Sequence, residues 1–144
     1  MKKVTNNEKE TISFGKEFAK TLKGGEVVLL VGDLGAGKTT FSKGVAAGLG
    51  VKRTVNSPTF VLMKVYEVKG KGKVKNFVHI DTYRGLDIFD LENIGALEFF
   101  TRQDCVSFVE WGENLEVYLK KKKIKFKKII IKNLDENTRS FEIK

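Results

Sequence analysis

Hydrophobic residues recur along the chain at spacings that distinguish helices from strands. Asn7 is suited to cap a helix, with Glu10 three residues later, and apolar residues then recur at helical spacing as far as Gly24. The next run, Val27 to Val31, is short, aliphatic and bounded by glycines, which is typical of a strand buried on both faces. The pattern therefore predicts an amphipathic helix followed by a buried strand.

Further elements alternate along the rest of the chain. Two β-rich runs, Phe60 to Val68 and Val74 to Ile80, are separated by so few residues that they predict an antiparallel hairpin. The remaining predictions, in chain order, are a helix from Lys38 to Leu49 closed by Gly50, a short helix capped by Asp90 and running through Leu97, a buried strand from Cys105 to Glu110, a helix from Glu113 to Lys120, and a hairpin of Lys125 to Lys132 with Arg139 to Ile143.

Length and composition restrict the class of protein. The chain has 144 residues with 41% hydrophobic content, which predicts one domain over residues 1–144 with its own core. The longest aliphatic run has five residues, whereas a membrane span needs about 20. The start of the chain lacks the apolar segment of a secretory signal, so we expect a cytoplasmic protein. The single cysteine, Cys105, is expected to be a small core residue.

Positive charge dominates the chain and is concentrated late in it. Lysine and arginine number 27 against 18 acidic residues, a net charge of +9 that favours polyanions such as RNA or nucleotides. Residues 120–128, called the lysine strip below, hold seven lysines in nine positions. The strip is interpreted either as a solvated face of a late helix and strand, which is favoured, or as an RNA-facing surface.

One motif predicts a phosphate site. Residues 32–39, GDLGAGKT, satisfy G-x-x-x-x-G-K-[ST] and lie between a predicted buried strand and a predicted helix. Glycines allow successive backbone N–H groups to point at phosphate oxygens, and the helix N-terminus adds positive partial charge. Lys38 would reach the β and γ phosphates and Thr39 would supply a hydroxyl to Mg²⁺. The predicted phosphate-binding segment comprises Asp33, Leu34, Gly35, Ala36, Gly37, Lys38, Thr39 and Thr40.

Two acidic residues end predicted strands near this loop. Asp81 lies in the run His79 to Arg84, where alternation puts His79, Asp81 and Tyr83 on one face. Asp81 is expected either to hold a metal-bound or attacking water, or to cap the next turn with Arg84 as a surface partner. His79 alone is expected to be a structural histidine. Glu110 ends an apolar run and is predicted to reach the Mg²⁺ shell, the alternative being a solvated strand-end acid.

Two further positions stay open on the sequence alone. Trp111 follows Glu110 and is either a lid or a core residue. Residues 57–60, SPTF, lie where GTPases carry a loop that senses the γ-phosphate, or simply begin a strand.

Together, GDLGAGKTT, SPTF, HIDTYR and VEWGE resemble the TsaE (YjeE) family of bacterial ATPases, in this order and at these spacings. The resemblance extends from the helix that contains Thr11 to about Trp111. The predicted elements themselves indicate a P-loop NTPase-like three-layer α/β fold with a mixed sheet, with a parallel centre and antiparallel flanking hairpins. The resemblance implies an ATPase required for N6-threonylcarbamoyladenosine at position 37 of tRNAs reading codons that start with A, acting with the partners TsaB and TsaD.

The resemblance also implies site roles by matching position. Lys38 and Thr39 are the phosphate and Mg²⁺ residues, Glu110 is the second Mg²⁺ ligand and Asp81 the catalytic acid. Thr11 lies near the adenine. Arg139, in the poorly matched C-terminal third, is a candidate nucleotide contact. ATP and Mg²⁺ are the implied cofactors, and tRNA is an indirect partner through the complex.

Three other functions are weighed against this one. A small-metabolite or nucleotide kinase would also use the loop, but it needs an arginine-rich lid, and the four arginines of the chain are scattered. A regulatory GTPase would need an N-K-x-D motif, which does not occur. A non-catalytic RNA-binding module using the lysine strip would leave the phosphate loop unexplained.

Overall fold

The computed structural model describes residues 1–32, 37–55, 63–81, 88–110 and 115–144. The strands are β1 (Lys2–Thr5), β2 (Val27–Val31), β3 (Met63–Glu67), β4 (Asn76–Asp81), β5 (Cys105–Glu110), β6 (Lys127–Asn133) and β7 (Arg139–Ile143). The helices are α1 (Glu8–Ala19), α2 (Lys38–Leu49), α3 (Ile88–Asn93), α4 (Ala96–Phe99) and α5 (Glu116–Lys121). All seven strands belong to one sheet, in the order β1-β7-β6-β2-β5-β4-β3.

The sheet is parallel at its centre and antiparallel at both sides. Strand β2 pairs in parallel with β5 and with β6, and β4 pairs in parallel with β5. The hairpin partner β3 is antiparallel to β4 on one side, and β7 and β1 follow antiparallel on the other. The predicted mixed α/β sheet is therefore confirmed, and the four parallel strands end at one common edge.

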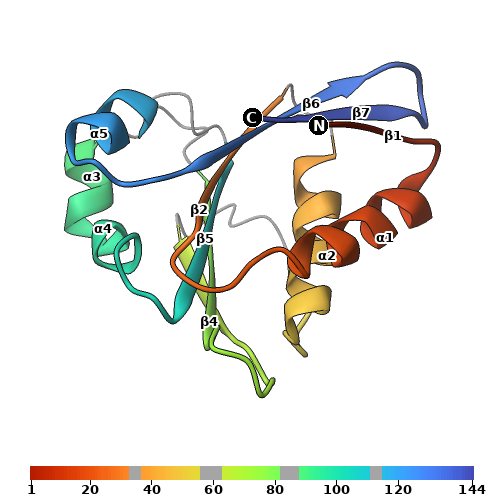
Figure 1. The fold of residues 1–144 in the computed structure, drawn as a ribbon. Coiled ribbons are helices and arrows are strands. Elements are labelled where there is room, and N and C mark those ends of the chain that lie inside the picture. The colour runs from red at the N-terminus through yellow and green to blue at the C-terminus, as the bar shows by residue number, and fades with distance from the viewer. Residues whose placement is uncertain (33–36, 56–62, 82–87, 111–114) are drawn as a thin grey trace.

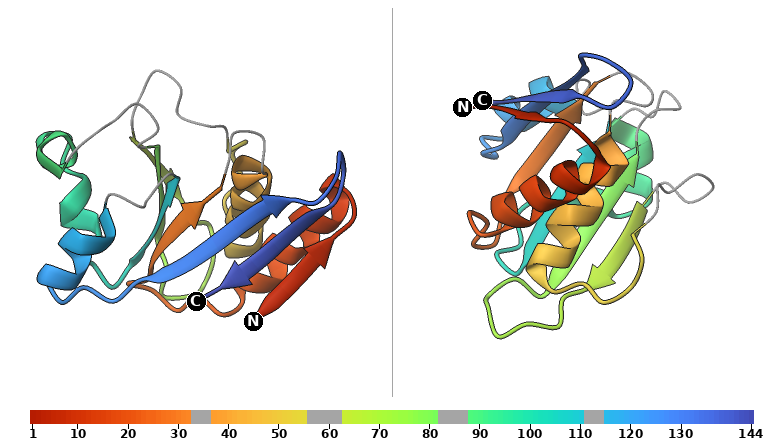
Figure 2. Two further views of the ribbon diagram at one scale, coloured as in Figure 1. Left: turned by 90° about the horizontal axis from the view of Figure 1, so that it is seen from above. Right: turned by 90° about the vertical axis from the view of Figure 1, so that its right-hand side faces the viewer.

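Helices cover both faces of the sheet (Figure 1). Helices α1 and α2 pack on one face, while α3, α4 and α5 lie on the other, and the view from above in Figure 2 shows the sheet between them. Alternation along β2 divides its side chains accordingly: Val28 and Leu30 join the core under α1 and α2, whereas Val27 and Leu29 join the second core. All four side chains are fully buried, so β2 is the predicted two-faced strand.

Local sequence signals explain several element boundaries. The bounds predicted for β2, α2, β5 and β7 agree with the structure. At the start of α1, the Asn7 side chain accepts a hydrogen bond from the Glu10 backbone N–H at 2.8 Å, which satisfies a donor that the helix leaves open. Cys105 is buried in the second core, and burial raises the pKa of its thiol to about 11, as suits a structural residue.

Three predictions of the elements were wrong or incomplete. Asp90 lies inside α3, which begins two residues earlier, and does not cap it. The apolar run as far as Leu97 is split into α3 and α4, because Gly95 between them has φ of +77°, outside the helical region. Helix α1 ends at Ala19, before the glycines, and the N-terminal strand β1 was missed because four residues carry too little pattern.

Glycines let the backbones of α1 and α2 touch. A Cβ added to Gly44 of α2 would lie 2.3 Å from the Ile12 carbonyl oxygen of α1, closer than real Cβ contacts. Gly15 of α1 has the same relation to α2, since its added Cβ would lie 2.6 Å from the Phe41 carbonyl oxygen. The position of α2, and of the phosphate motif at its start, therefore depends on this contact.

Replacing Gly44 with alanine is expected to lower the free energy of unfolding by about 1–3 kcal/mol, because the methyl group meets backbone that cannot move independently. Urea unfolding followed by circular dichroism measures the effect. Gly72→Ala is the matched control, since an added Cβ there meets nothing within 4 Å and stability should stay nearly constant. Equal stability of both variants would mean that the helices do not pack this closely.

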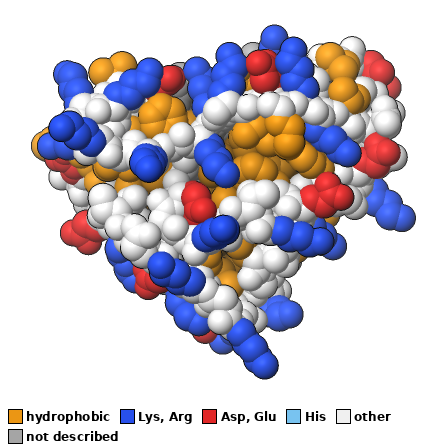
Figure 3. Space-filling model, in the orientation of Figure 1, with side chains coloured by type: hydrophobic (Ala, Val, Ile, Leu, Met, Phe, Trp, Pro, Cys, Tyr) orange, Lys and Arg blue, Asp and Glu red, His pale blue; other side chains and the backbone are white. Residues whose placement is uncertain are grey.

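The surface is strongly basic. Lysine and arginine side chains are spread over the whole face in Figure 3, among fewer acidic ones. Within the described residues, no helix is long and apolar enough to cross a membrane.

Candidate functional site

The phosphate motif lies at the carboxyl edge of the parallel strands. Strand β2 ends at Val31 and helix α2 begins at Lys38, so the predicted order of strand, loop and helix is present. Gly37 immediately precedes the helix and has φ of +97°, a conformation that side chains other than glycine rarely adopt. Residues 33–36, which complete the motif, lie outside the described residues.

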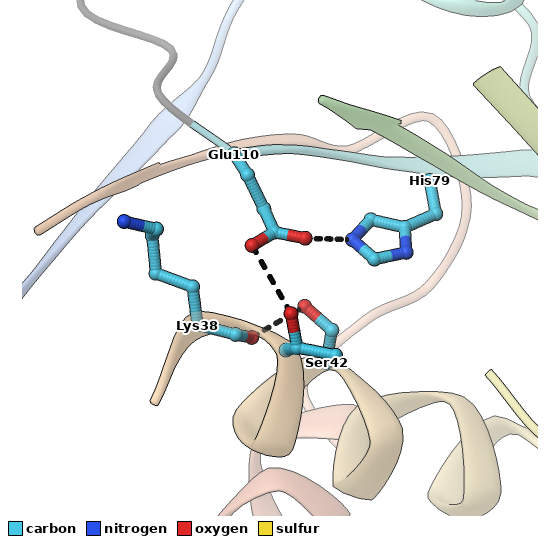
Figure 4. A network of polar contacts seen from close by, with 5 residues as sticks. Lys38, Ser42, His79 and Glu110 are labelled. Atoms are coloured by element: carbon cyan, nitrogen blue, oxygen red, sulfur yellow. Dashed lines mark hydrogen bonds and ion pairs between the residues drawn. The ribbon is translucent and has the colours of Figure 1, made fainter. Parts of the chain in front are cut away.

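A buried carboxylate lies beside the first turn of α2 (Figure 4). Glu110, the last residue of β5, is 3% exposed, and its Oε1 accepts a long hydrogen bond of 3.4 Å from Thr39 Oγ1. Its Oε2 is hydrogen-bonded to Nε2 of His79, which comes from β4 and is fully buried. Thr39 and Glu110 are 71 positions apart, so the tertiary structure brings the motif threonine to the strand-end acid.

Lys38 is held inside the site. Its side chain is 5% exposed, and its ammonium group donates a hydrogen bond to the backbone carbonyl of Gly32. The Ser42 hydroxyl, one turn later in α2, donates to the Lys38 carbonyl at 2.9 Å. Lys38 is thus buried at the start of α2 and lies near Glu110 (Figure 4).

Asp81 ends the neighbouring strand at the same height as Glu110. The two residues are direct partners in the parallel register of β4 and β5. Alternation puts Asp81 on the same face as His79 and as Phe77, which belongs to the core under α1 and α2. Asp81 is half-buried, so two acidic residues end neighbouring strands on the same face, Glu110 enclosed and Asp81 partly accessible.

The two outlying candidates, Thr11 and Arg139, are connected through β1. The Thr11 hydroxyl is hydrogen-bonded to the Thr5 hydroxyl at 2.7 Å, and Thr5 is the register partner of Arg139. The Arg139 side chain lies against Gly37, whose added Cβ would be 3.6 Å from Arg139 Nε. Arg139 therefore connects the N-terminal strand β1 with the end of the phosphate motif. The sequence analysis did not predict this arrangement because it missed strand β1.

The Arg139 guanidinium is anchored at the β6–β7 hairpin. Its Nη1 donates to the backbone carbonyls of Asp135 at 3.0 Å, Glu136 at 3.2 Å and Thr138 at 3.2 Å. These contacts hold the side chain beside the motif.

Several sequence candidates fall outside the described residues. They are Asp33, Leu34, Gly35 and Ala36 of the motif, the SPTF segment at 57–60, Tyr83 and Arg84, and Trp111. The contact of His79 with Glu110 was not foreseen, although the alternation that placed His79 beside Asp81 contained its signal.

The lysine strip lies near the amino ends of the parallel strands, opposite to the ends that carry the phosphate motif. Lys120 and Lys128 bind Glu116 at 3.3 and 3.2 Å, and their hydrogen bonds hold the pKa of the Glu116 carboxyl below its usual value. The other lysines from Lys122 to Lys127 line a cavity of about 710 Å³ beside Gly24, at the start of β2. The strip is therefore separated from Lys38 by the length of that strand.

If the strip is an RNA-facing surface, replacing Lys122, Lys123 and Lys125 with glutamine should weaken binding of an RNA transcript and leave nucleotide binding at the phosphate motif unchanged. The slope of log affinity against log salt should fall by about 2, because each phosphate contact contributes about 0.7. Fluorescence anisotropy at several salt concentrations measures this. Three other exposed lysines, Lys9 and Lys16 on α1 and Lys20 directly after it, serve as the control. Identical slopes for the two triple variants would mean that the lysine strip is only a solvated face.

The arrangement is suited to bind a phosphorylated ligand. It combines a glycine-bounded helix start, a buried lysine and a threonine hydroxyl beside two strand-end carboxylates, at the edge where α/β sheets collect ligands. These features define a phosphate-binding α/β protein.

The comparisons with known proteins agree with this class. The family model for the threonylcarbamoyl adenosine biosynthesis protein TsaE matches residues 5–141. The TsaE protein of Bacillus subtilis is 42% identical over 135 residues, covering 94% of this chain and 79% of the relative. That of Treponema pallidum is 39% identical over 116 residues, covering 80% and 81%.

A solved structure agrees as well. The crystal structure of Bacillus subtilis YdiB matches with a TM-score of 0.69 and 34% sequence identity, over 98% of this chain and 82% of that one. The chain belongs to the TsaE family and is thereby involved in the biosynthesis of threonylcarbamoyladenosine in tRNA.

Proposed function

We propose that the chain, as one P-loop NTPase-like domain over residues 1–144, is an Mg²⁺-dependent ATPase. Its hydrolysis serves formation of N6-threonylcarbamoyladenosine at position 37 of tRNAs that read codons starting with A. The observation that carries the proposal is the contact of Thr39 with Glu110, which joins the phosphate motif to a buried acid at 3.4 Å. An acid at this place is what a P-loop ATPase needs for its metal.

The residues at this contact fit Mg²⁺. The ion prefers hard oxygen ligands and is usually held by one or two protein groups, with water and substrate phosphates completing the octahedron. Thr39 Oγ1 and Glu110 Oε1 are two such oxygens side by side. In the described part of the chain no group of three or more His, Cys, Asp or Glu side chains could hold a metal by itself, in keeping with a site that substrate completes. When bound, Mg²⁺ supplies neutralisation of phosphate charge.

The other site residues have distinct roles in the proposal. Lys38, released from the Gly32 carbonyl, pairs with the β and γ phosphates, and backbone N–H groups at the start of α2 face them. Asp81, level with Glu110 and more accessible, orients the attacking water. Arg139, which lies beside Gly37, and Thr11, which is hydrogen-bonded to Thr5, line the part of the site that holds the nucleoside.

The proposal includes partners and a compartment. The chain acts in the cytoplasm with TsaB and TsaD, and tRNA meets it through that complex. Hydrolysis by the isolated chain is expected to be slow, because the transition state needs positive charge that a partner would supply when it completes the site.

Measuring ATP hydrolysis by the purified chain, alone and with TsaB and TsaD, tests the proposal. We expect slow Mg²⁺-dependent turnover that rises when both partners are present. A reaction that transfers phosphate to a small metabolite, with no release of free phosphate, would favour the kinase alternative instead. Absence of ATP binding in all mixtures would contradict the proposed ATPase.

A further inference from the structure

His79 is buried in a way that packing alone does not explain. Its side chain has no exposed surface and lies beside the Phe77 ring, with 6.2 Å between ring centroids. Its Nε2 contacts a carboxylate, which only accepts, so Nε2 carries the donated proton. The other ring nitrogen, Nδ1, is buried and has no hydrogen-bond partner among the described residues. An unsatisfied buried polar atom costs stability that an apolar side chain would avoid.

The donated hydrogen bond determines how the Glu110 carboxylate is turned. Oε2 of Glu110 is bound to His79, and this leaves Oε1 directed at the Thr39 hydroxyl (Figure 4). The two strands make this possible: Asp81 is opposite Glu110 in the register, and His79 lies two residues earlier on the same face of β4. His79 can therefore reach Glu110 from the neighbouring strand, on the face of the sheet that α1 and α2 cover.

We propose that His79 is a positioning residue that orients the Glu110 carboxylate toward Thr39 for binding of Mg²⁺ with ATP. This inference rests on the proposed function. Because His79 is fully buried, it acts through Glu110 and does not itself touch nucleotide or metal. Donors of this kind, behind a ligating carboxylate, hold its orientation and keep its oxygen aimed at the metal.

Two variants at position 79 separate the donor from the packing. His79→Gln keeps an N–H group near the place of Nε2, whereas His79→Leu keeps the bulk and loses the donor. Isothermal titration of the full chain with ATP, once with saturating Mg²⁺ and once in EDTA, is the measurement. His79→Leu should bind Mg²⁺-ATP about 10- to 100-fold more weakly and bind metal-free ATP as the native chain does. His79→Gln should recover most of the Mg²⁺-dependent affinity.

A second measurement needs no nucleotide. Nitrogen-15 NMR of the free protein should show a proton on Nε2 of His79, the only histidine of the chain. Replacing Glu110 with alanine should shift the Nε2 resonance. A native chain with no proton on Nε2 would overturn the inference.

The remaining outcomes are also decisive. A folded His79→Leu variant with native affinity for Mg²⁺-ATP would overturn the positioning role, and so would a folded His79→Gln variant as weak as His79→Leu. If His79→Leu fails to fold, His79→Asn, whose amide is too short to reach Glu110, takes its place beside His79→Gln. A native chain that does not bind ATP would refute the proposed function, and the role of His79 with it, while the NMR result would still report the His79–Glu110 hydrogen bond separately.

Discussion

Replacing Lys38 with alanine is expected to abolish productive ATP binding, with affinity falling by about 100-fold or more. The reason is that Lys38, 5% exposed, is the cation of the motif, and its ammonium would form charge-assisted hydrogen bonds with two phosphates. The fold should survive, since loss of one hydrogen bond, such as that from the ammonium to the Gly32 carbonyl, costs about 1 kcal/mol. Isothermal titration with ATP and Mg²⁺ is the measurement.

Helix α2 offers a matched control for this variant. Lys43→Ala removes another partly buried lysine from the same helix, five residues later and away from its first turn, and should leave ATP affinity unchanged. Circular dichroism confirms that both variants are folded. If the folded Lys38→Ala protein keeps native affinity and turnover, the phosphate motif is not the nucleotide site.

Replacing Glu110 and replacing Asp81 are expected to impair different steps, nucleotide binding in the first case and hydrolysis in the second. Glu110→Ala should weaken Mg²⁺-ATP binding by about tenfold or more, because a metal ligand acts in the ground state as well as in the transition state. Asp81→Ala should retain binding and lose hydrolysis, by about 100-fold or more in the single-turnover rate, because a group that orients water acts mainly in the transition state. The contrast rests on Glu110 being buried at Thr39 and Asp81 being half-buried beside it.

Nucleotide affinity and single-turnover rates for both variants, with and without TsaB and TsaD, provide the test. Loss of ATP affinity in Asp81→Ala with native affinity in Glu110→Ala would reverse the two assignments. Full activity of both variants would exclude the two acids from the site. Since both acids end buried strands, each measurement is paired with a thermal melt to separate misfolding from loss of function.

Much of the fold could be predicted because it is encoded locally. Strand β2 is an aliphatic run from Val27 to Val31, and helix α2 is closed by Gly50. Both carry their own start and stop signals in the sequence, and both have the predicted bounds in the structure. Elements without such signals were predicted poorly. Strand β1 has four residues with three exposed, and its place in the sheet depends on pairing with β7 at the other end of the chain.

The sequence by itself determined the strand, loop and helix that carry Lys38 and Thr39, and it marked Asp81 and Glu110 as acids that end buried strands. Periodicity and motif spacing are properties of neighbouring residues, so they can be read without the fold. Only the tertiary structure decided that Glu110 lies between Thr39 and His79, that Asp81 is its register partner, and that Arg139 reaches Gly37. These contacts join residues far apart in the chain, and they arise from the order of strands in the sheet, which no local pattern specifies.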